Sequence, residues 1–142
     1  MTDSTAPLSQ PLYGATIGQA IDRFFKKYTT FAGRASRSEY WWAVLAIGLI
    51  QIVFTILYFA AGGSAATANG TVNLTPLAIV VISVWGLFSL AVLIPTIAVT
   101  VRRLHDGNFS GWFYLLSLIG LSIVVFILTL LPSNSAGARF DN

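Results

Sequence analysis

Two short segments hold the side chains that could carry acid–base or anion chemistry. The first runs from Phe31 to Trp42, and the second from Arg102 to Trp112. Guanidinium groups can grip phosphate or carboxylate with two hydrogen bonds, and carboxylates or imidazole can accept protons. We therefore take both segments together as a candidate site for an anion or a partner, with seven members: Arg34, Arg37, Glu39, Arg102, Arg103, His105 and Asp106.

His105 beside Asp106 suggests a metal ligand or a general base. Neighbouring residues on a turn diverge, however, and the chain has no second histidine and no cysteine to complete a metal site. We favour a structural turn at Asp106 and Gly107. The sequence accordingly predicts no catalytic residue, no metal and no cofactor.

The elements that position these segments are apolar. The chain is 56% hydrophobic and 9% charged, whereas about a quarter of the residues in soluble domains are charged. From Tyr40 to Val101, and again from Trp112 to Leu131, no residue is charged. This pattern predicts an all-α membrane protein. Its basic residues lie next to apolar runs, where they face lipid headgroups, and this excludes a nucleic-acid partner.

Three segments are long enough to cross a bilayer core of about 30 Å. We predict spans at about 39–61, 76–101 and 111–131. Ser36 and Glu39 have capping-box spacing before the first, and Thr75 precedes Pro76 at the second. Three tryptophans would anchor the spans at the membrane interface, where indole rings accumulate: Trp41, Trp42 and Trp112.

The remaining segments flank these spans within a single membrane domain, 16–131. Residues 1–15 are predicted to form a disordered tail, and 132–142 a loose polar tail. Residues 16–29 carry an aromatic face opposite a basic face, with Thr16 and Gln19 spaced as a capping box. This pattern is typical of an amphipathic helix that lies in the headgroup plane or packs on the spanning helices.

Orientation follows from the basic residues. Seven of the eight lysines and arginines fall before the first span or between the second and third, and Arg139 alone follows the third. Since cytoplasmic segments are enriched in Lys and Arg, we predict a cytoplasmic N-terminus and an external C-terminus.

The two charged segments also resemble the signatures of a bacterial inner-membrane family, the domain of unknown function family 805. The signatures are Phe-x-Gly-Arg-x-x-Arg-x-Glu-aromatic-Trp, present from Phe31 to Trp41, and Arg-Arg-Leu-His-Asp-x-x-x-Ser-Gly-Trp, present from Arg102 to Trp112. The family usually ends in Asn-Arg-Phe-Gly, whereas this chain reads Ala138-Arg139-Phe140-Asp141. The resemblance implies a small multi-pass protein of the inner (plasma) membrane, and defines no activity.

We predict a non-enzymatic protein whose cytoplasmic charged cluster binds anionic phospholipid headgroups or a protein partner, and which forms a homo-oligomer. Two alternatives stay open. One is an oligomeric transporter or channel component, although the spans lack the ionisable residue that ion pathways usually contain. The other is an enzyme acting on a phosphorylated lipid headgroup, with His105 or Asp106 as base and arginines as clamp.

Overall fold

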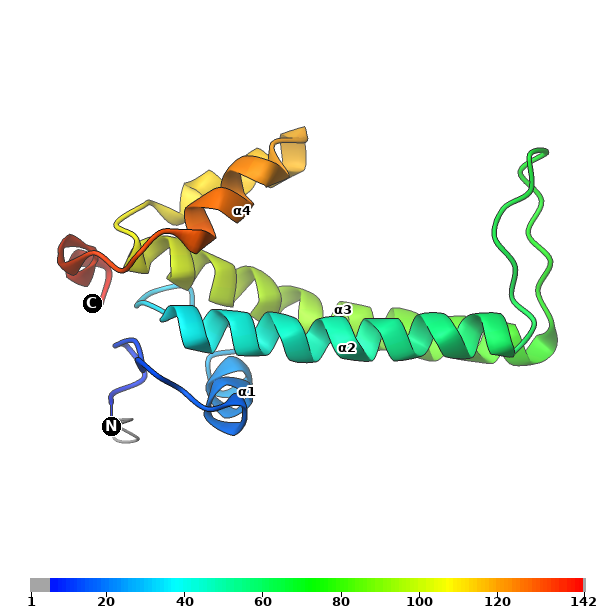
Figure 1. The fold of residues 1–142 in the computed structure, drawn as a ribbon, viewed down its shortest axis with the longest axis horizontal. Coiled ribbons are helices and arrows are strands. Elements are labelled where there is room, and N and C mark those ends of the chain that lie inside the picture. Colours follow the sequence, from blue (N-terminus) through cyan, green and yellow to red (C-terminus); the bar gives the residue numbers. More distant parts are fainter. Residues whose placement is uncertain (1–5, 142) are drawn as a thin grey trace. The chain divides into compact units, whose positions relative to one another are not determined.

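The computed structural model describes residues 6–141, and this part of the chain contains helices and no strand. The fold is all-α, as the sequence predicts (Figure 1). The described residues form four α-helices and two 3-10 helices, in this order: α1 (Ile17–Lys26), α2 (Arg37–Ala60), α3 (Pro76–Asp106), η1 (Gly111–Ile119), α4 (Ser122–Leu130) and η2 (Ser135–Phe140).

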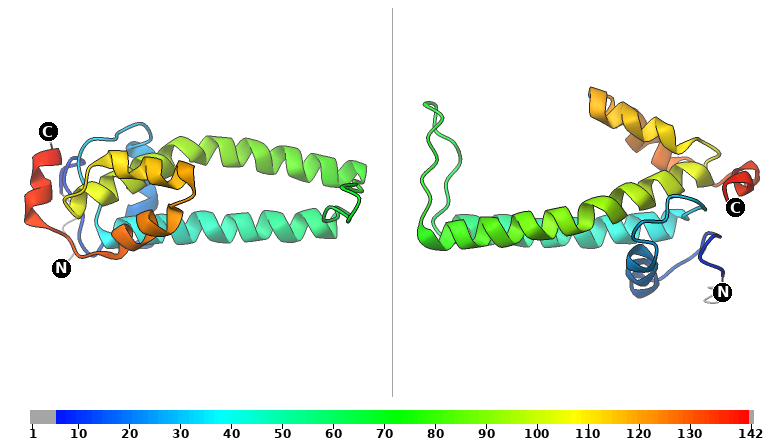
Figure 2. Two further views of the ribbon diagram at one scale, coloured as in Figure 1. Left: turned by 90° about the horizontal axis from the view of Figure 1, so that it is seen from above. Right: turned by 180° about the vertical axis from the view of Figure 1, so that it is seen from behind.

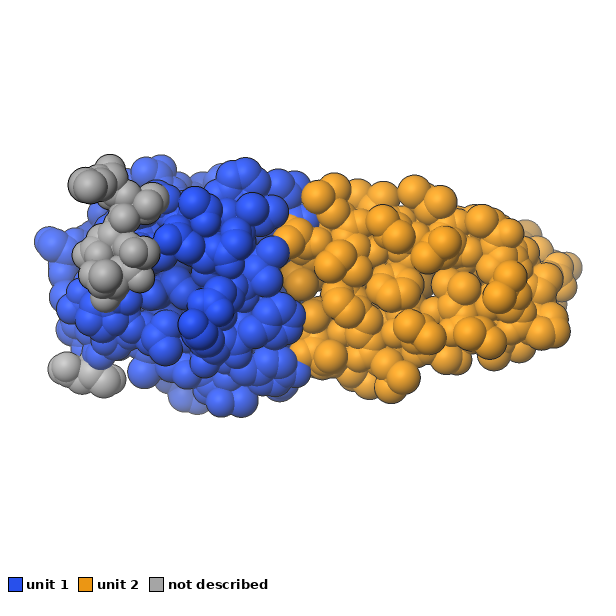
Figure 3. Space-filling model, turned by 90° about the horizontal axis from the view of Figure 1, so that it is seen from below, with its two compact units in different colours: residues 1–45, 94–142 blue, residues 46–93 orange. Residues whose placement is uncertain are grey.

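The chain divides into two compact units (Figure 3). Unit 1 comprises residues 1–45 and 94–142, so it holds both ends of the chain and the seven candidate residues. Unit 2 comprises residues 46–93, which are the distal parts of α2 and α3 and the loop that joins them. Unit 1 therefore contains the whole candidate site.

The helices begin where the predicted caps lie. The Thr16 hydroxyl accepts from the Gln19 amide while the Gln19 side chain accepts from the Thr16 amide. Ser36 and Glu39 make the same reciprocal pair at the start of α2, and Thr75 Oγ1 accepts from the Ala78 amide at the start of α3. These bonds satisfy amides that have no partner inside a helix.

Helices α2 and α3 are each long and apolar enough to cross a bilayer, and they are the two described helices with this property. The prediction ended the second span at Val101, but α3 continues to Asp106. Charges end a hydrophobic run without ending a helix. The segment 102–106 is therefore the last part of α3, and Gly107 follows the helix as the turn.

Unit 2 is held together by apolar and aromatic contacts. The rings of Phe54 and Trp85 stack 6.2 Å apart between centroids, and Phe54 also contacts Phe88. The Trp85 indole donates to the Gln51 side chain. Most large apolar side chains of this unit point outward, among them Ile56 and Leu87. Such a surface suits surroundings of lipid.

The segment predicted as a third span is not one continuous helix. The 3-10 helix η1 ends at Gly120, whose φ is 87°, and α4 then runs back (Figure 2). The hairpin is visible in both views. Gly120 lets the chain turn, because this left-handed conformation is costly for residues with a Cβ. Hydropathy alone could not distinguish two short helices from one long one.

Both tails are packed where the sequence predicted loose ends. Leu12 is 3% exposed, and its amide donates to Glu39 Oε2 at 2.9 Å. At the other end, η2 brings Phe140 onto His105. Residues 6–15 and 132–141 are thus part of unit 1, whereas the first five residues of the predicted disordered tail lie outside the described part.

Candidate functional site

Asp106 is the acceptor shared by four segments of unit 1. Its carboxylate accepts from Arg103 Nη1 at 2.7 Å, from Tyr13 Oη at 3.1 Å and from the Ser133 hydroxyl, and it lies 3.8 Å from Arg34 Nη1. The side chains of Asp106 and Arg103 are both fully buried. A buried carboxylate requires this degree of pairing. Asp106 therefore connects α3, both tails and the Arg34 loop.

Arg103 fastens the end of α4. Its Nε donates to the Thr129 carbonyl oxygen at 3.0 Å, and its Nη2 donates to the Leu131 carbonyl oxygen. The Asn134 amide donates to the Asp106 carbonyl oxygen at 2.7 Å. The two bonds from Arg103 satisfy carbonyl groups at the end of α4, and the bond from Asn134 satisfies the last carbonyl group of α3. The guanidinium is thereby used within the fold and is not available to a ligand.

Arg34 pairs with the C-terminal tail. Its Nε and Nη2 donate to the two carboxylate oxygens of Asp141, each at 2.8 Å. These hydrogen bonds raise the pKa of Arg34, so it stays charged. Asp141 lies in the stretch Ala138-Arg139-Phe140-Asp141, which differs from the terminal Asn-Arg-Phe-Gly of the family that the two signatures resemble.

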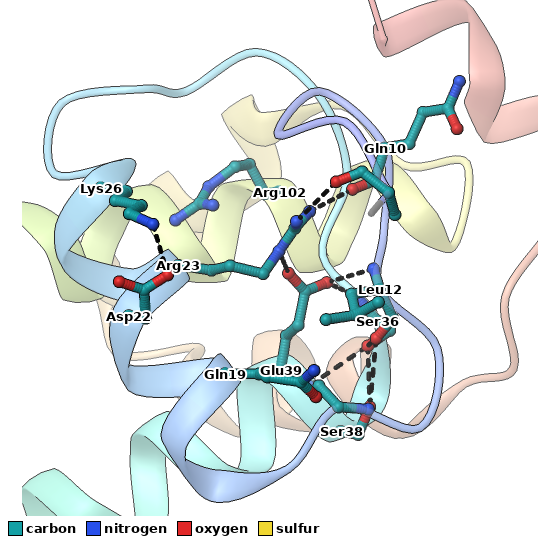
Figure 4. A network of polar contacts seen from close by, with 12 residues as sticks. Gln10, Leu12, Gln19, Asp22, Arg23, Lys26, Ser36, Ser38, Glu39 and Arg102 are labelled. Carbon is teal, nitrogen blue, oxygen red and sulfur yellow. Dashed lines mark hydrogen bonds and ion pairs between the residues drawn. The ribbon is translucent and has the colours of Figure 1, made fainter. Parts of the chain in front are cut away.

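Glu39 pairs with Arg23 of α1 and not with Arg102 or Arg103 (Figure 4). Its carboxylate accepts from Arg23 Nε and from the amides of Leu12 and Ser36. Arg23 also donates to carbonyl oxygens of the N-terminal segment, at 3.1 Å to Ala6 and 3.2 Å to Pro7. Glu39 thereby holds α1 and the N-terminal segment on α2.

Two cations beside this pair are buried and incompletely bonded. Lys27 and Arg102 are each 1% exposed. Lys27 Nζ and Arg102 Nη2 lack a hydrogen-bond partner within the described residues, although Arg102 Nε donates to the Ala98 carbonyl oxygen. Burial lowers the pKa of Lys27 to about 7. This side chain therefore sheds its proton far more readily than an exposed lysine.

His105 is held between backbone and ring. Its Nδ1 lies 2.9 Å from the Gly33 carbonyl oxygen, and because a carbonyl only accepts, Nδ1 carries the hydrogen. Phe140 stacks on the imidazole, with centroids 4.1 Å apart. Gly137 packs so closely that a Cβ there would lie 2.2 Å from the His105 carbonyl oxygen. His105 and Asp106 thus have separate partners, and both lie in the last turn of α3, so that the turn predicted at Asp106 and Gly107 begins at Gly107.

Few of the candidate residues remain accessible. Arg37 is exposed, Arg34 is half-buried and the other five are buried. Of the predicted interface anchors, Trp112 is 77% exposed and Trp42 is 38% exposed, while Trp41 packs edge-on against Phe126 of α4. Most of the candidate cluster is therefore buried within unit 1, and Arg37 is its exposed member.

A cavity of about 600 Å³ lies beside the cluster, wholly within unit 1. Its walls are mostly apolar and come from α3, η1, the loop at Phe31 and the C-terminal tail. Ile97, Val101, Leu115 and Trp112 line it together with Tyr114 and Phe140, and His105, Ser110 and Arg139 supply the polar side chains. Gly111 keeps this wall close to α3, since a Cβ there would lie 2.5 Å from Val101 Cγ1.

Sequence reasoning missed Arg23, Lys27, Tyr13, Asp141 and Arg139 as members of this region. Arg23 and Lys27 were assigned to the solvated face of an amphipathic helix, yet both are buried. Tyr13 and Asp141 lie in tails that carry no periodic pattern. Arg139-Phe140 matches the middle of the terminal motif Asn-Arg-Phe-Gly given with the resemblance, but this match did not indicate what the two residues contact.

Two inner membrane proteins of Escherichia coli are similar to this chain over most of its length. The chain is 33% identical over 108 residues to the inner membrane protein YhaH of Escherichia coli strain K12, covering 73% of this chain and 79% of that protein. It is 29% identical over 121 residues to the inner membrane protein YhaI of the same strain, covering 82% and 87%. No solved structure matches the chain.

The family described as "Protein of unknown function (DUF805)" matches residues 28–142, which include both charged segments and the C-terminal tail. The resemblance drawn from the two signatures is thereby confirmed. With inner-membrane relatives of nearly its own length, the chain belongs to the DUF805 family of membrane proteins.

Proposed function

We propose that this membrane protein binds one anionic phospholipid in the cavity of unit 1, with the phosphate at Arg139 and an acyl chain along the apolar wall. The single observation that carries this proposal is the composition of the cavity. The cavity is lined by apolar side chains such as Ile97, Val101 and Leu115, and also by Arg139. A lipid has the same division between an apolar and an anionic part.

Size and charge support this ligand. A cavity of about 600 Å³ falls within the ~300 to 1,000 Å³ usual for sites of small molecules. Arg139 is exposed, makes no ion pair within the described residues and lies 4.6 Å above the Phe140 ring. It therefore keeps its donors for a phosphate, which arginine can bind with two hydrogen bonds.

This proposal moves the anion site away from the arginines first considered for it. The guanidinium of Arg103 donates to Asp106 and to backbone carbonyl oxygens, and that of Arg34 donates to the carboxylate of Asp141. Arg102 is 1% exposed. Headgroups can reach Arg37 and Arg139, which are exposed, and each contributes about 1 kcal/mol of attraction to an anionic leaflet.

We also propose that the charged end of unit 1 faces the cytoplasm. The loop of residues 61–75 contains no charged residue, whereas the segments that flank the charged ends of α2 and α3 are basic. Positive residues are retained on the cytoplasmic side of bacterial inner membranes.

The lipid site can be tested by exchanging single residues and measuring retained lipid. Arg139→Gln removes the proposed phosphate contact, and Ala32→Phe fills the cavity from the loop that lines it. Native mass spectrometry of protein extracted in mild detergent should show that both variants lose bound phosphatidylglycerol. Retention of phosphatidylglycerol by the parent chain should also fall as the salt concentration rises. The reason is that the Debye length, over which charges attract, shortens to about 8 Å at physiological ionic strength.

Lys26→Gln is the matched control, since it removes one exposed positive charge from α1 without touching the cavity. It should leave retention unchanged. Equal losses for Lys26→Gln and Arg139→Gln would show that net charge alone governs lipid binding and would overturn the site. Unchanged retention in both cavity variants would do the same.

A further inference from the structure

The hairpin formed by η1 and α4 presents an unusually apolar surface for a segment tied to a charged cluster. From Gly111 to Leu131 no residue is charged. Leu118 is 74% exposed and Ile119 is 71% exposed, and both lie next to the turn at Gly120. Ile123, Phe126 and Ile127 on α4 are also exposed. Exposure of such an apolar tip to water would be unfavourable.

Neither arm of the hairpin is long enough to cross a bilayer. Nine residues of 3-10 helix rise about 18 Å, and nine residues of α-helix rise about 14 Å. A bilayer core is about 30 Å thick. Each arm therefore reaches roughly the middle of a bilayer.

The two ends of the hairpin are fixed in the same place. η1 follows the last turn of α3 after a short link, in which the Phe109 amide donates to the Leu104 carbonyl oxygen at 2.9 Å. After α4, the Asn134 amide donates to the Asp106 carbonyl oxygen, and Arg103 binds the carbonyl groups of Thr129 and Leu131. A segment that crossed the membrane would separate these ends by the full bilayer thickness.

The turn satisfies its own backbone groups, as a lipid-exposed turn must. The Leu121 amide donates to the Leu116 carbonyl oxygen at 2.8 Å, and the Gly120 amide donates to the Ser117 carbonyl oxygen at 3.4 Å. The Val124 amide donates to the Leu121 carbonyl oxygen at 3.0 Å, which starts α4. The bend therefore exposes few unpaired polar groups to hydrocarbon.

We infer that the hairpin 111–131 is a re-entrant element that inserts into the acyl chains of one leaflet and returns, so that both termini lie on the same face of the membrane. The membrane occupies this surface because the chain is an integral membrane protein and α4 packs directly on the start of the spanning helix α2, through Phe126 and Trp41. The charge distribution agrees. With the C-terminus moved to the face of the other basic segments, all eight lysines and arginines share one side.

The absence of cysteine from the parent chain makes single-cysteine labelling clean. Four positions serve as reporters: Thr30→Cys for the face of the basic segments, Ser64→Cys for the opposite loop, Ser135→Cys for the C-terminal tail and Ile119→Cys for the tip. A membrane-impermeant maleimide is applied to intact cells and to inverted membrane vesicles. We expect positions 30 and 135 to react in inverted vesicles only, position 64 on intact cells only, and position 119 in neither.

Depth is measured on the same Ile119→Cys variant with a nitroxide label in lipid vesicles. Leu87→Cys is the matched control, because it is 69% exposed in the middle of α3. Position 119 should show the same preference for collisions with oxygen over a water-soluble nickel complex as position 87. Oxidative cross-linking at position 119 tests for a second copy of the chain as the occupant, and we expect no cross-linked dimer.

Three results would each overturn the inference. Reaction of position 135 together with position 64 would mean that residues 111–131 cross the membrane. Reaction of position 119 with the aqueous reagent would mean that the tip lies outside the lipid. Efficient cross-linking at position 119 would mean that another copy of the chain covers the tip.

Discussion

Units 1 and 2 contain parts of the same two long apolar helices, α2 and α3, and are stabilised in different ways. Unit 2 relies on apolar and aromatic contacts, and a side-chain hydrogen bond from Trp85 to Gln51 joins its two helices. Unit 1 relies on buried ion pairs that join segments distant in sequence, such as Arg23 with Glu39 and Arg34 with Asp141. Hydropathy thus accounts for unit 2, whereas specific charged residues are needed to close unit 1.

This difference gives a physical reason for the charged residues that the two signatures contain in a membrane protein. Burying a charge is costly unless it is paired, and pairs that link separate segments select one arrangement among many. In unit 1 these pairs hold the hairpin, both tails and α1 around the end of α3. Of these segments, α3, the hairpin and the C-terminal tail line the cavity proposed for lipid, so the buried pairs shape the site without contacting the ligand.

The largest expected effect comes from removing the shared acceptor of unit 1. Asp106→Asn keeps the size of the side chain but leaves Arg103 buried and without its counter-charge. Breaking a buried pair in this way costs about 3 to 5 kcal/mol. Equilibrium unfolding in mixed detergent micelles should show a loss of stability of this order.

Asp22→Asn is the control, because it removes a carboxylate that pairs with Lys26 at an exposed site. It should change stability by less than about 1 kcal/mol. A small effect of Asp106→Asn would mean that unit 1 does not depend on its buried pairs and that the contrast with unit 2 does not hold.

The sequence predicted the elements better than their connections. Caps at Thr16, Ser36 and Thr75 were predictable because they depend on residues three positions apart. The pairing of Glu39 with Arg23 was not predictable, because helix periodicity places Arg23 on the basic face and gives no information on what covers that face. Tertiary packing decided the pairing.

The hairpin shows a second limit of sequence reasoning. Residues 111–131 match a spanning helix in length and hydropathy, and the turn depends on one glycine, Gly120. A glycine inside an apolar helix is common in membranes, so its presence alone could not indicate a break. The tail contacts that require the return, from Asn134 and Ser133 to Asp106, lie beyond the apolar segment.

An intermediate effect is expected at Lys27, where unit 1 contains a buried cation without a hydrogen-bond partner in the described structure. Its pKa falls from 10.5 to about 7 on folding. Between these values the unfolded chain binds the proton and the folded chain does not, so stability rises with pH. The slope approaches about 1.4 kcal/mol per pH unit, the value for one proton.

Lys27→Met should stabilise the protein at neutral pH and flatten this rise, as measured by unfolding in detergent from pH 7 to 10.5. Lys26→Met is the control, since Lys26 is exposed and paired with Asp22, and it should leave the slope intact. An unchanged slope in Lys27→Met would show that Lys27 keeps its proton in the folded state, and that the buried charge is balanced in another way.

The smallest effect is expected in unit 2, at the bond between Gln51 and Trp85. Gln51→Leu removes the acceptor and puts an apolar side chain of similar size in its place. The stack of Trp85 on Phe54 remains. Side-chain hydrogen bonds between membrane helices contribute on average about 0.6 kcal/mol, since the unfolded chain in the membrane also finds partners. The same detergent unfolding experiment should detect a loss of this size, and the double variant Gln51→Leu with Trp85→Phe should isolate the coupling. A loss as large as that of Asp106→Asn would show that unit 2, too, depends on a polar contact, and the two units would then be stabilised alike.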